Sequence, residues 1–207
     1  MRTILLTLCL FMGTILSAQN NVLIEIENAN AAYKVITGDF VRTQTNVAKG
    51  TSIKADGTLY IVGEDQMAQH YKAPSTDLLI INGNDFYMIR GKKTNKFNTE
   101  KNKTMRSLRN TLLYCVHGKP MVLATENGAE ITAEKKANEY EVVLISTKKT
   151  PRGYAKIVLT YDLKSKLLTK MQMDEYNGNS TLYEMSDMKI NKRIDAKVFN
   201  GPTKERF

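Results

Sequence analysis

The strongest constraint on the fold is the alternation of apolar and polar residues in ADGTLYIVGEDQMAQHYKAP, residues 55–74. Apolar side chains recur at alternate positions on both sides of Gly63-Glu64-Asp65. A period of two is typical of β-strands that bury one face, and a short polar segment containing glycine favours a turn. The segment therefore predicts two antiparallel strands joined by a turn.

A second hairpin is predicted in LLIINGNDFYMI, residues 78–89. The Asn82-Gly83 pair separates two apolar runs and tolerates the positive φ angles that tight hairpin turns require. Four consecutive apolar residues from Leu78 to Ile81 predict a strand that is covered on both faces. Similar patterns predict further strands in residues 39–50, 140–147, 154–163, 167–176 and 180–190.

Two segments have a helical period instead. The first helix is predicted over residues 20–36, ending at Gly38, with apolar side chains three or four positions apart: Leu23, Ile26, Ala29, Tyr33 and Ile36. The second is predicted within residues 102–120, where Gly118 and Pro120 follow one apolar stripe: Met105, Leu108, Leu112 and Cys115.

The order of these elements indicates an α+β domain built on a curved antiparallel sheet, because strands flank a helical insertion and follow an N-terminal helix. A large antiparallel sheet twists and curls, which leaves one concave face. Two amphipathic helices are available to cover that face.

The first residues predict export. MRTILLTLCLFMGTILSA has a positive charge at Arg2, an apolar core and the small residues Ser17-Ala18, as in a cleavable secretory signal peptide. We therefore expect a signal peptide over residues 1–18 and a single soluble domain over residues 19–207, located in the periplasm. Cleavage leaves Cys115 as the one cysteine, so no internal disulfide is expected.

The chain is basic, with a formal net charge of +9 at pH 7, and its densest basic run extends from Arg90 to Arg109. Nucleic acid is not expected as a partner, because a periplasmic protein rarely meets it and Phe97 is the one aromatic residue in the run. A solvated lysine-rich loop followed by a basic helix face is the simplest interpretation. The alternative is transient contact with anionic lipid headgroups or with an acidic docking partner.

Few residues in the sequence are candidates for catalysis or metal binding. Cys115 and His117 point about 200° apart on a helix, so we expect a buried cysteine and a capping histidine, with His70 at the surface or rim of the sheet. Two isolated histidines match no recognised zinc pattern, and the sequence contains no nucleotide-binding motif. We expect no enzymatic activity, metal or cofactor, although carboxylates from distant segments remain open as an acid–base pair.

Four segments occur in a familiar order: GDFVRTQ, GTLYIVGEDQMAQHYKAP, LLIINGNDFYMI and TYDLKSKLLTKMQMDEYNGNSTLYEMSDMKINKRIDAKVF. Together they resemble the periplasmic lipoprotein carriers of the LolA type, including the LolA-like proteins of Bacteroidetes. In the last segment, Asn191, Ile194 and Phe199 match an N-x-x-I/V step followed by phenylalanine. The resemblance covers nearly all of the chain after residue 18.

The chain departs from the family at two places. Val62-Gly63-Glu64 stands where the family often has basic residues and a proline, and Ala68-Gln69 stands where it commonly has Arg-Trp. In the best-known carrier an arginine near that turn holds the helical lid closed, and Gly63 cannot do so.

The resemblance implies an incomplete β-barrel with helices across its mouth and an apolar cavity for acyl chains. Such a protein, expected to be a monomer, carries lipoproteins or related lipids from an inner-membrane extraction complex to an outer-membrane acceptor. The alternative is an envelope sensor or interaction module with the same fold that recognises a lipid or peptide signal.

The residues expected to line the cavity come from the strands and from the helical insertion: Phe40, Leu59, Ile61, Met67, Leu79, Ile81, Met88, Leu108, Leu112, Met171 and Met173. Core packing against the helices is the alternative for each of them. A shift of one residue in the strand phase would exchange the inner set for the outer set. The strand methionines suit either an ordinary core or a deformable apolar pocket.

Overall fold

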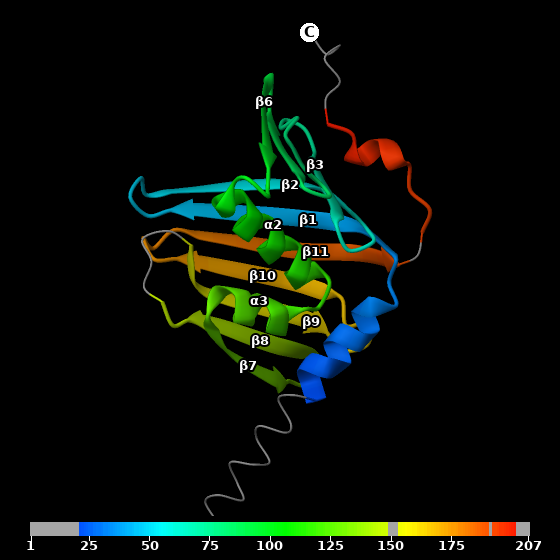
Figure 1. Cartoon of the computed structure of the whole chain (residues 1–207), viewed down its shortest axis with the longest axis vertical. Helices are drawn as coiled ribbons and strands as arrows, with labels where there is room; N and C mark the ends of the chain where they lie inside the picture. Colours follow the sequence, from blue (N-terminus) through cyan, green and yellow to red (C-terminus); the bar gives the residue numbers. More distant parts are fainter. Residues whose placement is uncertain (1–20, 149–152, 191, 202–207) are drawn as a thin grey trace, which may run out of the picture.

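One antiparallel sheet with α2 (Lys103–Val116) and α3 (Pro120–Asn127) on one side organises the protein (Figure 1). The computed structural model describes residues 21–148, 153–190 and 192–201, so the predicted signal peptide lies outside the described part. Within that part, no helix is long and apolar enough to cross a membrane.

The strands fall into two groups along the chain. The first group is β1 (Val35–Asn46), β2 (Thr51–Val62), β3 (Gln66–Tyr71), β4 (Leu78–Asn82), β5 (Asp85–Arg90) and β6 (Lys93–Asn98). The second group is β7 (Ala129–Lys135), β8 (Glu139–Ser146), β9 (Tyr154–Asp162), β10 (Leu168–Glu175) and β11 (Ser180–Ile190). Besides a helix over residues 21–31, the chain forms α2 (Lys103–Val116), α3 (Pro120–Asn127) and a 3₁₀ helix, η1 (Ala196–Phe199).

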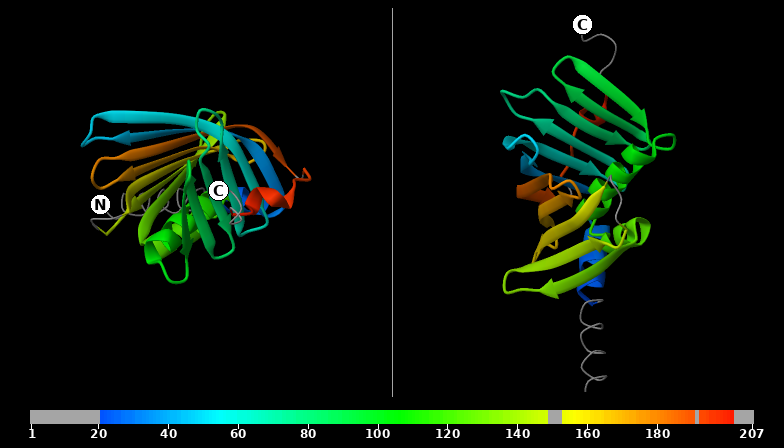
Figure 2. Two further views of the ribbon diagram at one scale, coloured as in Figure 1. Left: turned by 90° about the horizontal axis from the view of Figure 1, so that it is seen from above. Right: turned by 90° about the vertical axis from the view of Figure 1, so that its left-hand side faces the viewer.

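The strand order is β6-β5-β4-β3-β2-β1-β11-β10-β9-β8-β7. Each group is thus a meander of sequential antiparallel neighbours, and the pairing of β1 with β11 joins the two groups at the centre of the sheet. The sheet curves strongly but β6 and β7 remain unpaired edges (Figure 2), which confirms the incomplete barrel. The α+β class is likewise confirmed.

Most of the predicted strands are present, and the turns explain why. Gly63 and Gly83 adopt φ angles of 57°, which glycine tolerates without strain, and they connect β2 to β3 and β4 to β5. In β4, Ile81 packs in the main core while Ile80 packs with Phe199 on the opposite face. The prediction of a strand covered on both faces is therefore confirmed.

The predicted N-terminal helix is too long. Residues 21–31 are helical, but Ile36 lies in β1, where it pairs with Ile61 of β2 and is 1% exposed. Gly38 lies in the same strand and does not end a helix. A Cβ atom at Gly38 would come within 2.3 Å of Met188 Sδ, so glycine allows β1 and β11 to approach closely here. Strand pairing thus outweighs the helical spacing of the sequence.

Three further elements were missed by the sequence patterns. Part of the lysine-rich run forms edge strand β6, and residues 129–135 form the opposite edge, β7. Gly118, at φ 62°, follows the end of α2 as predicted, but Pro120 starts the new helix α3. Proline suits the first helical position because the missing N–H would have no helical partner there.

The main hydrophobic core lies between the concave face of the sheet and the helices, with α2 crossing in front of β1, β11 and β10 (Figure 1). A smaller core lies on the convex face, where the segment containing η1 packs over β3 and β4. Helix α2 therefore covers part of the concave face.

Candidate ligand-binding cleft on the concave face

The eleven residues predicted to line a cavity belong to one hydrophobic cluster on the concave side. Nine are buried with at most 9% of their surface exposed: Phe40, Leu59, Ile61, Met67, Leu79, Ile81, Leu112, Met171 and Met173. Met88 and Leu108 are partly buried and pack against this cluster. The structure brings all eleven together, but nine of them pack closely and leave little free surface. Their role in ligand binding stays a prediction.

Open space lies at the edge of this cluster. A cleft of about 470 Å³, called here the α2 cleft, is lined by residues of α2, of β9 and of the β10–β11 turn region: Lys103, Thr104, Met105, Ser107, Leu108, Gly153, Tyr154, Glu175, Tyr176 and Asn177. A second pocket of about 210 Å³ shares Ser107, Gly153 and Tyr154 with it, so the two adjoin. The α2 cleft has the size of small-molecule sites and combines apolar walls with a few polar groups.

Local hydrogen bonds fix the helix that forms one wall. Asn102 caps α2, because its side-chain oxygen accepts a hydrogen bond from Met105 N at 3.0 Å. Arg106 Nε donates to Thr99 O at 2.9 Å, and Arg109 Nε donates to Gly83 O at 2.8 Å. Two cations of the basic run therefore hold α2 to the strand connections, and a docking role for the run stays a prediction.

A polar and aromatic group lies on the concave face beside Phe40. The Arg42 guanidinium carbon is 4.8 Å from the centroid of the Tyr71 ring, which meets the Phe40 ring edge-on at 5.0 Å. The Tyr71 hydroxyl donates to Gln69 Oε1 at 3.3 Å. Burial raises the pKa of Tyr71 far above its ordinary value, so this phenol stays protonated.

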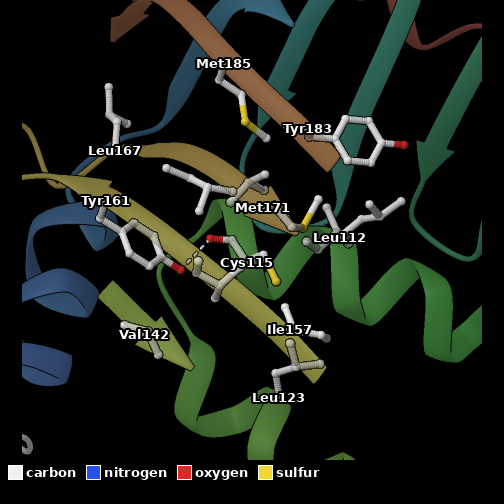
Figure 3. Packing of buried hydrophobic residues seen from close by; sticks show 14 of the residues in the cluster. Leu112, Cys115, Leu123, Val142, Ile157, Tyr161, Leu167, Met171, Tyr183 and Met185 are labelled. Atoms are coloured by element: carbon white, nitrogen blue, oxygen red, sulfur yellow. Dashed lines mark hydrogen bonds between the residues drawn. The ribbon is translucent and has the colours of Figure 1, made fainter. Parts of the chain in front are cut away.

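Two more tyrosines connect this group to the α2 cleft. Tyr183 of β11 pairs directly with Arg42 of β1, and its ring centroid is 6.1 Å from that of Phe40. Burial, and secondarily Tyr183, raise the pKa of Tyr154, which lines the cleft. Figure 3 shows Tyr183 in the interior with Leu112 and Met171. Tyr71, Tyr183 and Tyr154 thus all pack in the concave hydrophobic cluster.

Neither Cys115 nor His117 is placed for catalysis. Cys115 is fully buried, burial raises the pKa of its thiol, and its carbonyl accepts a hydrogen bond from the Tyr161 hydroxyl at 2.9 Å (Figure 3). His117 caps the C-terminus of α2 and is 7% exposed, and burial lowers its pKa to about 4. The predicted buried cysteine and capping histidine are confirmed.

The remaining candidate groups are dispersed. His70 lies half-buried on the convex face, with Nε2 3.0 Å from Val198 O and the ring edge-on to Tyr60. Among residues 21–148, 153–190 and 192–201, no three His, Cys, Asp or Glu side chains are grouped as a metal site would require. The α2 cleft, which adjoins the main hydrophobic core, is therefore the candidate site for a ligand.

Sequence reasoning did not place Met105 and Tyr154 at the cleft, nor Arg42 and Tyr183 beside Phe40 on the concave face. One available signal was strand parity: Arg42 is two positions from Phe40, so both side chains point to the same face of β1. Tyr154 becomes important only through the packing of α2 against the sheet, which the strand pattern does not specify.

Comparison with known proteins identifies the fold family. The model of the family described as "Outer membrane lipoprotein carrier protein LolA" matches residues 31–201, and no curated protein sequence matches the chain. Among solved structures, the chain is similar to an uncharacterized conserved protein from Thermus thermophilus, with 10% identity, 91% and 96% of the two chains covered and a TM-score of 0.53. It is also similar to a DUF1329 family protein from Desulfovibrio piger, with 9% identity, 90% and 97% coverage and a TM-score of 0.50. A LolA superfamily protein from Nitrosomonas europaea has 10% identity, 89% and 98% coverage and a TM-score of 0.45.

Proposed function

The chain belongs to the LolA family of outer membrane lipoprotein carriers, and from this premise we propose that it binds acyl chains of lipoproteins or related lipids on its concave face. The proposal rests on the α2 cleft, which opens beside Leu108 at the edge of the main hydrophobic core. An acyl chain that enters there has the buried side chains of the sheet directly beyond it.

The packed interior requires α2 to act as a movable cover. Displacing the helix from the sheet would open the concave core, which contains the buried side chains of Leu79, Ile81 and Met171. Each acyl methylene that leaves water is stabilised by about 0.8 kcal/mol, so a long chain can offset the lost helix packing. Methionines such as Met171 and Met173 adapt to the irregular surface that a flexible tail presents.

The wider role in this proposal is transport. After removal of a signal peptide over residues 1–18, residues 19–207 would act as a single monomeric domain in the periplasm. The domain would accept acylated cargo from an inner-membrane extraction complex and deliver it to an outer-membrane acceptor. Release would follow from a higher affinity of the acceptor for the cargo, because a ligand moves an equilibrium only through its differential affinity. No catalytic step is needed.

Native mass spectrometry of the protein after mild extraction tests the proposal. We expect co-purified acyl species with the wild type, and their loss in Leu108→Gln, which places an amide in the α2 cleft. Met121→Gln is the matched control, because Met121 is an exposed apolar residue of α3 outside the cleft. It should retain the acyl species.

A different result would overturn the proposal. Wild-type protein that carries no acyl species, and that does not bind a fluorescent fatty acid added in vitro, is not an acyl carrier. If such ligand-free protein instead co-purified with a membrane partner of the envelope, the result would favour the sensor or interaction module.

A further inference from the structure

Arg42 carries a positive charge on the concave face without an anionic partner. Its Nε atom is buried and has no hydrogen-bond partner among the described residues. Every ion pair recorded within the described part of the chain is made by a lysine, so no carboxylate there neutralises Arg42. Arg42 as a whole is half-buried, but its buried Nε–H has no partner, and leaving such a donor unpaired is costly, so the group calls for an explanation such as a binding role.

The surroundings hold the guanidinium in place without neutralising it. The Tyr71 ring covers one side at 4.8 Å, and such cation–π contacts restrain a cation while leaving its N–H groups free. Neighbouring strands contribute the small residue Ala55 and the phenol Tyr183, which both pair with Arg42 in the sheet register. The nearby Asp77 accepts a hydrogen bond from Gly91 N at 3.2 Å and makes no ion pair with Arg42.

We propose that Arg42 binds the acidic group of an amphiphilic ligand, a carboxylate or phosphate ester attached to an acyl chain, whose tail extends past Tyr183 toward the α2 cleft. The inference rests on the proposed function, because the tail occupies the same acyl site. A guanidinium offers several N–H donors in one plane, which suits the oxygens of either acid. Tyr183, which pairs with Arg42 in the sheet register, adds a hydroxyl group on the same face, whereas the Tyr71 hydroxyl already donates to Gln69 Oε1.

Charge selectivity follows from this arrangement. A neutral acyl ligand gains the apolar contacts but leaves Arg42 unneutralised, whereas an acidic ligand supplies the missing anion. Among the residues that line the α2 cleft, Glu175 is the one carboxylate, and Asn177 Nδ2 donates to its Oε2 atom at 3.0 Å. Lys103 lines the same cleft and carries the opposite charge.

The test compares three ligands with the same tail: palmitic acid, palmitoyl lysophosphatidic acid and neutral monopalmitoylglycerol. Their affinities are measured by displacement of a neutral fluorescent acyl probe from the purified protein. We expect at least one acid to bind roughly ten- to a hundredfold more tightly than the neutral lipid, as for hydrogen bonds to charged groups. The acid that shows this preference identifies the group that Arg42 recognises.

Three variants assign the preference to Arg42. Arg42→Gln should bind acidic and neutral ligands equally, and Arg42→Lys should retain part of the preference. Arg193→Gln removes the same charge from an exposed residue of the segment on the convex face and should behave as the wild type. Thermal unfolding of each variant verifies that it is folded.

The outcomes separate this inference from the proposed function. Equal affinities of the wild type for all three ligands, or an unchanged acid preference in Arg42→Gln, would overturn the role of Arg42 while leaving acyl binding established. Failure of the wild type to bind any of the three ligands would overturn the proposed function itself.

Discussion

Lys119 Nζ lies 2.9 Å from Glu64 Oε1, and this ion pair joins the junction of α2 and α3 to the turn between β2 and β3. The hydrogen bond from Lys119 lowers the pKa of Glu64. Gly63 precedes Glu64 in that turn and contributes no side chain. The chain thus connects its helical insertion to the sheet through an acidic turn residue and a lysine on the helices.

Breaking this ion pair is expected to increase local opening of α2 and α3 while changing the free energy of unfolding only slightly. Glu64 is 82% exposed, and exposed ion pairs contribute about 1 kcal/mol or less. Lys119→Met should therefore change the free energy of unfolding only slightly but accelerate hydrogen exchange at the helix amides. The double variant Lys119→Glu with Glu64→Lys should restore slow exchange, and unchanged exchange in Lys119→Met would contradict the prediction.

Acidification is expected to destabilise the protein through His117. Its folded-state pKa of about 4 lies below the ordinary value of 6.5, so the unfolded chain binds more protons between these limits. The free energy of unfolding should be greatest above pH 6.5 and fall by about 2 kcal/mol on going to pH 4.5. Urea unfolding at several pH values measures this change. His117→Gln should show a flatter pH dependence in this window, and an equally steep one would contradict the assignment.

Gly118 is expected to tolerate substitution less well than Gly63. Both residues have positive φ angles, but a Cβ at Gly118 would lie 2.8 Å from Asn30 Nδ2 and 2.9 Å from Ile26 Cγ2, whereas nothing lies within 4 Å at Gly63. Gly63→Ala should lose about 1 kcal/mol from the left-handed backbone alone. Gly118→Ala should lose roughly 1–3 kcal/mol more through steric overlap, measured by urea unfolding. Equal losses of unfolding free energy in the two variants would show that the N-terminal helix, which contains Ile26 and Asn30, shifts to make room for the added methyl group.

Cys115 is expected to be unreactive in the folded protein. Its side chain is fully buried and burial raises its pKa, so little thiolate forms and reagents cannot reach it. Iodoacetamide should label it in guanidinium chloride but on the order of a thousandfold more slowly without denaturant, as measured by mass spectrometry. Rapid labelling of the folded protein would reveal an accessible thiol and reopen the question of catalysis.

Features that depend on local chemistry were predictable from the sequence. Asn82-Gly83 specified a hairpin because few other residue pairs tolerate that turn. The alternation around Leu59 and Met171 gave the correct strand phase, because one face of each strand is apolar. These signals lie within a few residues of one another and do not require knowledge of the tertiary structure.

Features that depend on distant partners were not predictable. Ile36 continues the helical spacing of residues 23–33, yet its pairing with Ile61 places it in a strand. Strand β6 contains Phe97 as its one large apolar residue. Its pairing with Phe86 of β5 provides the apolar contact that the sequence of β6 alone does not indicate. Arg42 was overlooked because a charged residue in an alternating strand is usually expected to face solvent.

The pairing of β1 with β11 also determines when the sheet can be completed. Phe40 and Met185 are partners in this register although they lie near opposite ends of the described chain. Contacts between such distant residues form slowly, because a long loop must close first. Until the last strand has emerged and docked, one side of β1 is an open edge that can pair with other chains, so the final strand protects the nascent protein from aggregation.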